Sequence, residues 1–69
     1  MNITQKISML CAYKNISQRK LAEMIGQTPS NFSQKMKRQT FTQEELECIA
    51  HVLGCSYVFG FEFPDGTKI

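Results

Sequence analysis

The sequence is poor in cysteine. Its 69 residues include only Cys11, Cys48 and Cys55, and this odd number excludes a fully paired disulfide framework. Small secreted domains usually depend on such a framework, whereas cytosolic proteins keep their thiols reduced. We therefore expect a reduced protein that works in the cytoplasm.

Long apolar runs are also missing. No stretch approaches the roughly 18 consecutive apolar residues that are needed to cross a bilayer. Lys6 interrupts residues 1–10, which therefore lack the apolar centre of a signal peptide. We expect a soluble, intracellular protein with no membrane partner.

No catalytic set of residues is evident in the sequence. The single histidine, His51, does not form a recognisable set with a serine nucleophile signature and an orienting carboxylate. No glycine-rich loop of the phosphate-binding type occurs. We expect the protein not to be an enzyme and to have no cofactor and no small-molecule ligand.

A metal site is disfavoured by the spacing of the thiols. Cys48, His51 and Cys55 could lie near one helix flank, with Cys11 as a fourth ligand. Structural zinc sites use four ligands and closely spaced cysteine pairs, which this sequence lacks. We expect small, half-buried side chains at these positions and no metal.

The length allows one domain, and its charge is segregated. Residues 14–38 contain six Lys or Arg side chains and one acidic residue, a local balance of +5 within a net charge of +2. Residues 39–69 contain five acidic residues and one lysine, a balance of −4. A basic half favours a polyanionic partner such as nucleic acid, although a lopsided solvated surface has the same charges.

Apolar residues at helical spacing mark the N-terminal segment. Ile3, Ile7 and Leu10 form one stripe of an amphipathic helix, and Asn2 can cap its start. This pattern predicts a helix over residues 3–13.

A second strong signal for a helix start occurs later in the chain. Thr42 and Glu45 have the spacing of a capping box, in which two side chains satisfy two free amides of the first turn. Together with a stripe of aliphatic residues they predict a helix over residues 43–53, which Gly54 ends.

Two short helices are predicted between these outer ones. Ser17 is a good N-cap, because its hydroxyl accepts a hydrogen bond from a free amide, and Gly26 suits the left-handed conformation at a helix end. Thr28 gives the next cap, and a proline follows at the first helical position. The sequence therefore predicts a helix-turn-helix over residues 17–36, with its second helix over residues 28–37.

This second helix is apolar on one narrow side only. Phe32 and Met36 lie four residues apart and are expected to face inward, whereas most of the other side chains are polar or basic. The major groove of DNA, about 12 Å wide, admits one helix. We predict that this helix enters the groove.

Near the C-terminus, aromatic residues occupy every second position: Tyr57, Phe59, Phe61 and Phe63. This alternation predicts a strand over residues 57–63, and the turn sequence after it lets residues 67–69 return as a second strand. We expect a mainly α fold, a helix-turn-helix bundle of about four helices (residues 1–56) with a short C-terminal β-hairpin (residues 57–69).

Two placements of the aromatic strand are open. It can pack on its own helices, or it can pair with its copy in a second subunit. A lone hairpin is marginal in water, and an exposed aromatic edge favours pairing with another strand. We favour a homodimer in which the four aromatic side chains form the dimerisation element.

The helix-turn-helix segment resembles the phage Cro and repressor family, also called the XRE family. The resemblance covers about residues 3–55 and rests on caps, apolar positions and a glycine in register: Ile16, Ser17, Gln18, Leu21, Ala22, Ile25, Gly26, Thr28, Ser30, Phe32 and Ser33. It implies a bundle of four or five helices that binds operator DNA, usually as a dimer.

The resemblance also implies roles for individual residues. Pro29, Ser30 and Gln34 match positions that usually face base edges, with Asn31 beside them, and Gln18 matches a phosphate-binding position. Gln34 is the best candidate for discrimination, because glutamine can pair with adenine through two hydrogen bonds. Further candidates for phosphate contact are basic: Arg19, Lys20, Lys35, Lys37 and Arg38.

The sequence thus predicts a DNA-binding regulator of transcription, a small repressor of the kind that phages or mobile elements carry. Its partner would be double-stranded operator DNA, and its place in the cell the nucleoid. An alternative is an antitoxin, which would mask a second protein with its aromatic hairpin and regulate its own gene through DNA binding.

Overall fold

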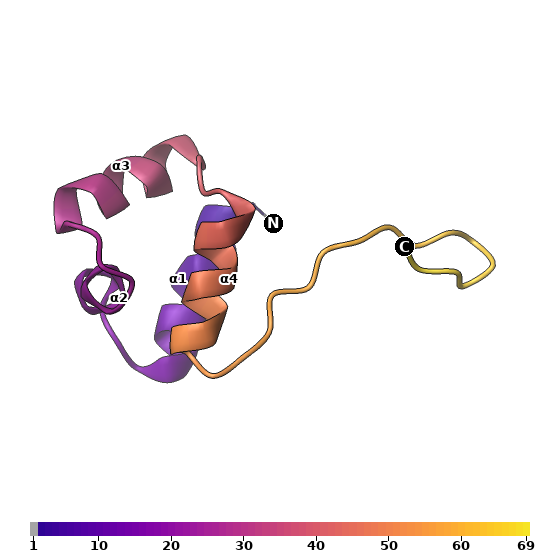
Figure 1. Ribbon diagram of the computed structural model, residues 1–69, viewed down its shortest axis with the longest axis horizontal. Coiled ribbons are helices and arrows are strands. Elements are labelled where there is room, and N and C mark those ends of the chain that lie inside the picture. Colours follow the sequence, from indigo (N-terminus) through magenta and orange to yellow (C-terminus); the bar gives the residue numbers. More distant parts are fainter. Residues whose placement is uncertain (1) are drawn as a thin grey trace.

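The computed structural model describes residues 2–69, and these residues form four helices. They are α1 (Ile3–Lys14), α2 (Gln18–Met24), α3 (Pro29–Arg38) and α4 (Gln43–Val52). In Figure 1 the helices form a rounded body, and the C-terminal segment projects away from it. We call residues 3–53 the helical body and residues 54–69 the tail. The mainly α, helix-turn-helix fold is as predicted.

All four helix starts are fixed by polar caps. The side chains of Asn2, Ser17, Thr28 and Thr42 each accept a hydrogen bond from the amide three residues later. The predicted capping box of α4 is confirmed, and α1 has a second one between Asn2 and Gln5. Because each cap satisfies amides that a helix leaves free, the four starts follow from local sequence.

The helix ends are also set by residues close to them in the sequence. Gly26 and Gly54 follow α2 and α4 in the left-handed region, with φ of 75° and 73°. Asn15 and Gln39 take the same conformation after α1 and α3, although they carry side chains, each with φ of 56°. Left-handed residues of this kind turn the chain and let end carbonyls be satisfied.

The core of the helical body takes one or more side chains from every helix. Its largest fully buried members are Ile7, Leu21, Phe32 and Ile49. The ring of Phe32 also meets Phe41 edge to face, with centroids 5.5 Å apart. One further contact ties α1 to the end of α3, because Thr4 Oγ1 donates to the carbonyl of Met36 at 2.5 Å. The inward faces that the sequence predicts are therefore the faces that pack.

The predicted strands over residues 57–63 and 67–69 do not form. The described tail has a single antiparallel bridge, between Glu62 and Lys68, around a turn in which the amide of Phe63 donates to the carbonyl of Thr67 (2.7 Å). Figure 1 shows this loop well away from the helices. Because a two-stranded hairpin needs a third strand or a helix to pack on, its alternating pattern is not enough to make strands here.

Candidate nucleic-acid interface

The helix-turn-helix consists of α2, a tight turn and α3. The amide of Gln27 donates to the carbonyl of Ala22 at 2.9 Å, which closes α2 one residue before Thr28 caps α3. Leu21 from α2 and Phe32 from α3 belong to the same buried cluster. The two helices therefore share a core, which fixes the direction of α3 relative to α2.

The outward face of α3 is polar and free of packing. On the inward side, Phe32 and Met36 are buried. The four predicted base-contact residues are all exposed: Pro29, Ser30, Asn31 and Gln34. Ser30 and Gln34 lie one turn apart and so share a face of the helix. Gln34 can therefore meet a base edge together with the short Ser30 side chain.

The first turns of α2 and α3 enclose a hollow of ≈ 150 Å³, which we call the notch. Its lining comes from both helices: Gln18, Arg19, Pro29, Phe32 and Ser33. The structure thus brings together Gln18, a predicted phosphate contact on α2, and Pro29, a predicted base contact on α3. The two residues are more than ten positions apart in the sequence. A hydrogen bond to α1 orients Gln18, because its Nε2 donates to Ser8 Oγ at 3.3 Å.

Ser33 is a lining residue of the notch for which the sequence analysis gives no role. It is exposed and follows Pro29 and Ser30 by about one helical turn. The helical spacing of α3 was a signal that could have found it. Its hydroxyl is a polar group on the same side as Gln18.

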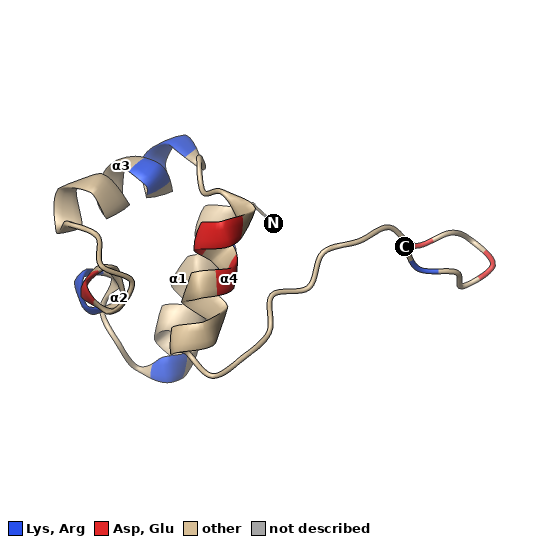
Figure 2. Ribbon diagram, in the orientation of Figure 1, with Lys and Arg blue, Asp and Glu red and all other residues tan. Residues whose placement is uncertain are grey.

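The C-terminal end of α3 is basic. Lys37 and Arg38 are exposed there, and Figure 2 shows their blue segment at the far end of α3 from the turn. Cations at this end are favoured by the helix dipole, so the same charges that suit phosphates also suit the helix. Arg19 and Lys20 add exposed basic side chains on α2, although Lys20 lies 3.9 Å from Glu23.

Lys35 differs from the other basic residues of α3. Its ammonium donates to Glu45 of α4, and the pair is partly buried, with side-chain exposures of 32% and 18%. Gln27 Nε2 donates to the same carboxylate oxygen at 2.7 Å. No sequence pattern indicates this cluster, because its members come from the turn, from α3 and from α4.

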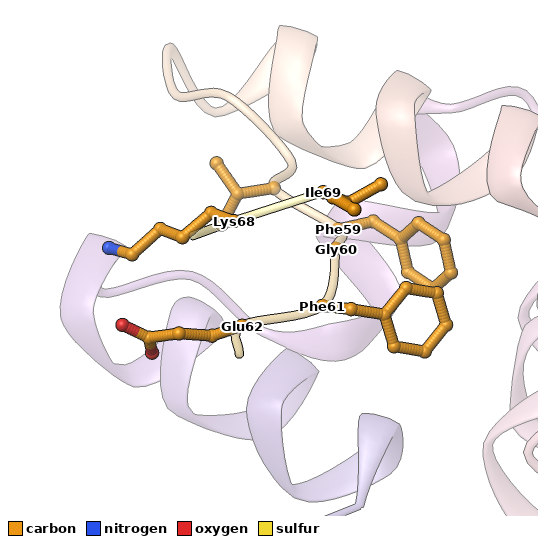
Figure 3. Close-up of a pocket in the computed structure, with 7 residues that line it drawn as sticks. Phe59, Gly60, Phe61, Glu62, Lys68 and Ile69 are labelled. Carbon is orange, nitrogen blue, oxygen red and sulfur yellow. The ribbon is translucent and has the colours of Figure 1, made fainter. Parts of the chain in front are cut away.

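The predicted dimerisation residues are unevenly placed. Tyr57 is half-buried and lines a groove of ≈ 170 Å³ between α1 and α4. Phe59, Phe61 and Phe63 are 73%, 67% and 50% exposed. Figure 3 shows the rings of Phe59 and Phe61 on one side of the loop with Ile69. Beyond Tyr57, these aromatic side chains do not pack on their own helical body.

The cysteines are not gathered into a site. Cys11 is buried in the core, whereas Cys48 and Cys55 are exposed rather than half-buried as expected. Across residues 2–69, no three His, Cys, Asp or Glu side chains lie close enough together to hold a metal ion. In the same part of the chain, no helix is long and apolar enough to cross a membrane.

Comparison with protein families identifies a DNA-binding domain family. Residues 6–57 match the model of the Cro/C1-type HTH DNA-binding domain, and this range contains α2, α3, α4 and the turns between them. No significant match is found among curated proteins or among solved structures. The matched range covers most of the chain and includes the notch.

Proposed function

The chain belongs to the family of Cro/C1-type helix-turn-helix DNA-binding domains, and from this premise we propose that it is a sequence-specific repressor. It would bind an operator in double-stranded DNA and block transcription by occupying it. A small repressor of this kind suits a phage or another mobile element. The observation that carries the proposal is the exposed polar face of α3 beside the notch.

The proposed division of roles follows from position on that face. Gln34 discriminates bases, since its amide can pair with adenine through two hydrogen bonds. Ser30 and Asn31 are shorter and add less specific contacts, and Pro29 offers apolar contact to a thymine methyl group. Contacts that position the helix without reading sequence come from exposed side chains around it: Gln18, Arg19, Lys37 and Arg38.

Selection of bound duplexes from a random DNA pool tests this function. We expect a defined operator and, for Gln34→Ala, loss of preference at one base position, about 1–3 kcal/mol in discrimination. Lys37→Ala is the matched variant for a phosphate contact. It should weaken binding to all sequences alike and reduce the salt slope by about 0.9. If the pool yields no preferred sequence, or if both variants behave alike, the proposed roles are wrong.

We further propose that the protein binds as a homodimer held by the tail. Two recognition helices about 34 Å apart would then match a two-fold operator. Support comes from the exposed aromatic rings and Ile69 on one side of the loop, because exposed apolar clusters favour association. A second copy could also supply the strand that this hairpin lacks.

Sedimentation of the full chain and of a Phe59→Ser/Phe61→Ser variant tests the dimer. We expect the full chain to sediment as a dimer at micromolar concentration and the variant as a monomer. Tyr13→Ser is the matched control, because Tyr13 is 85% exposed but lies on α1. A monomeric full chain, or a variant that remains dimeric, would refute the role of the tail.

The same exposed tail favours one alternative, an antitoxin whose tail masks a second protein. DNA binding would then serve to regulate its own gene. The alternative predicts that a second protein co-purifies in stoichiometric amount from its natural host, and that Phe59→Ser/Phe61→Ser abolishes this. Purification of the chain alone, as a homodimer that binds its operator, would favour the repressor.

A further inference from the structure

Resting on the proposed DNA binding, we propose that Glu45 is a specificity-determining residue that withholds Lys35 from the DNA phosphates. Lys35 lies on the recognition helix, next to Gln34, where a free ammonium would add non-specific affinity. The Glu45 carboxylate pairs with this ammonium in the way that a phosphate would. Glu45, which lies outside the helix-turn-helix, thereby limits the number of phosphates that the protein neutralises.

The Glu45 carboxylate is held in place by groups other than Lys35. Its Oε1 accepts from the amide of Thr42 at 2.9 Å in the capping box of α4. Its Oε2 accepts from Gln27 Nε2 at 2.7 Å. The oxygen of the same side-chain amide, Gln27 Oε1, is buried and has no hydrogen-bond partner. These two hydrogen bonds orient the carboxylate independently of Lys35, so that it is a fixed acceptor for the ammonium.

The pair also differs from the other ion pair of the described residues. Lys20 and Glu23 are 60% and 58% exposed and 3.9 Å apart on one helix, a geometry that contributes little in water. Lys35 and Glu45 join two helices and are shielded at 32% and 18% exposure. Shielding strengthens the attraction and reduces screening by salt. A phosphate that approaches Lys35 must therefore compete with Glu45 for the charge of the ammonium.

The consequence for binding comes from counterion release. Each lysine that newly neutralises a phosphate adds about 0.9 to the slope of log K against log salt, and this term provides nearly all non-specific affinity. A lysine already neutralised by Glu45 adds nothing. Lys37 and Arg38, which are exposed, keep their full contribution. Capture of Lys35 therefore lowers non-specific binding without loss of base contacts, and it raises specificity.

Binding to a short mixed-sequence duplex across a salt series tests this with Glu45→Gln. Glutamine can still complete a capping box, so the variant removes the charge and retains the cap. We expect the slope to steepen by about 0.9, which over a fourfold rise in salt adds a loss of about 3.5-fold. Glu47→Gln is the matched control, since Glu47 is exposed on the same helix and its loss changes net charge equally. Its slope should remain that of the wild type.

A double variant assigns the effect to the lysine. Glu45→Gln/Lys35→Met should restore the wild-type slope, because the released cation is gone. If Glu45→Gln and Glu47→Gln have equal slopes, or if the double variant keeps the steeper slope, the inference is overturned. If instead the wild-type protein does not bind duplex DNA at all, the proposed function fails and the salt series shows this separately.

Amine acetylation of the wild-type protein gives a second readout that needs no variant. We expect Lys35 to react several-fold more slowly than Lys37 in the free protein, and its rate to be unchanged when duplex is added. The rate at Lys37 should fall on addition of duplex. Equal rates in the free protein, with protection of both lysines by DNA, would overturn the inference even if Glu45→Gln failed to fold.

Discussion

The helical body and the tail both contain many apolar side chains, but only the body buries them. Its core includes Phe32, Ile7 and Leu53, each 5% exposed or less. In the tail, Val58 and Phe59 are 85% and 73% exposed. Apolar composition therefore does not by itself make a core. An element must also have a second element against which to pack.

The backbone explains why the two regions differ. A helix satisfies most of its hydrogen bonds within itself, and the four caps complete the first turns of the body. An extended segment needs a neighbouring strand for the same purpose. In the tail, only residues around the turn have such partners, among them Phe61 and Ile69, whose backbone groups are bonded to each other. The tail thus lacks the support that each helix has locally.

The largest test of this contrast compares two phenylalanines. Phe32→Ala should lower the free energy of unfolding by about 3–5 kcal/mol, because it leaves a cavity in the core. Phe59→Ala should change it by about 0.5 kcal/mol or less, as expected for an exposed site. Chemical denaturation of both variants measures the difference, at one protein concentration below dimerisation. Similar losses would mean that the tail packs on the body in solution.

Thiol reactivity is a smaller test of the same contrast. Burial raises the pKa of the Cys11 thiol, which keeps it in the unreactive neutral form. Cys48 and Cys55 are exposed. We expect an alkylating reagent to modify Cys11 at least about a hundredfold more slowly than Cys55. This ratio corresponds to a free energy of about 2.8 kcal/mol for the local opening of the core that exposes Cys11. Mass spectrometry of timed digests gives the rates, and a denaturant should make them equal.

The smallest expected effect concerns the turn of the tail. The amide of Thr67 donates to Asp65 Oδ1 at 2.9 Å and lowers the pKa of the Asp65 carboxyl. Because the pKa is lowered on turn formation, the turn gains stability above the ordinary carboxyl pKa and loses it as pH falls through the lowered value. We expect the Thr67 amide resonance to titrate with this low pKa while resonances of the helical body do not move with it.

Asp65→Asn is the control for that titration. Asparagine keeps an acceptor for the Thr67 amide but does not titrate in this range. The Thr67 resonance should therefore become independent of pH. If it still titrates, another group near the turn causes the shift.

Much of the fold could be predicted from local sequence. Ser17, Thr28 and the pair Thr42 and Glu45 predicted helix starts that the structure has, because a cap and its amide are at most three residues apart. The inward positions Phe32 and Met36 were also correct. The strand over residues 57–63 was wrong, since its stability depends on a partner surface that the sequence pattern does not describe.

The candidate site was predictable only in part. Helical spacing placed Gln34 and its neighbours on one exposed face, and the structure agrees on their exposure. The engagement of Lys35 by Glu45 could not be predicted, because the two residues lie on different helices and their approach depends on the packing of α3 against α4. Which of these side chains touch DNA stays a prediction.

The sequence by itself determined the four helices, their caps, the turn at Gly26 and the polar face of α3, because each depends on residues within about one turn of each other. Tertiary structure alone decided three features. It joined Gln18 and Arg19 to α3 in the notch, it paired Lys35 with Glu45, and it left the tail beyond Tyr57 exposed. Each of these depends on which surfaces meet when helices pack, and that is a property of the whole chain.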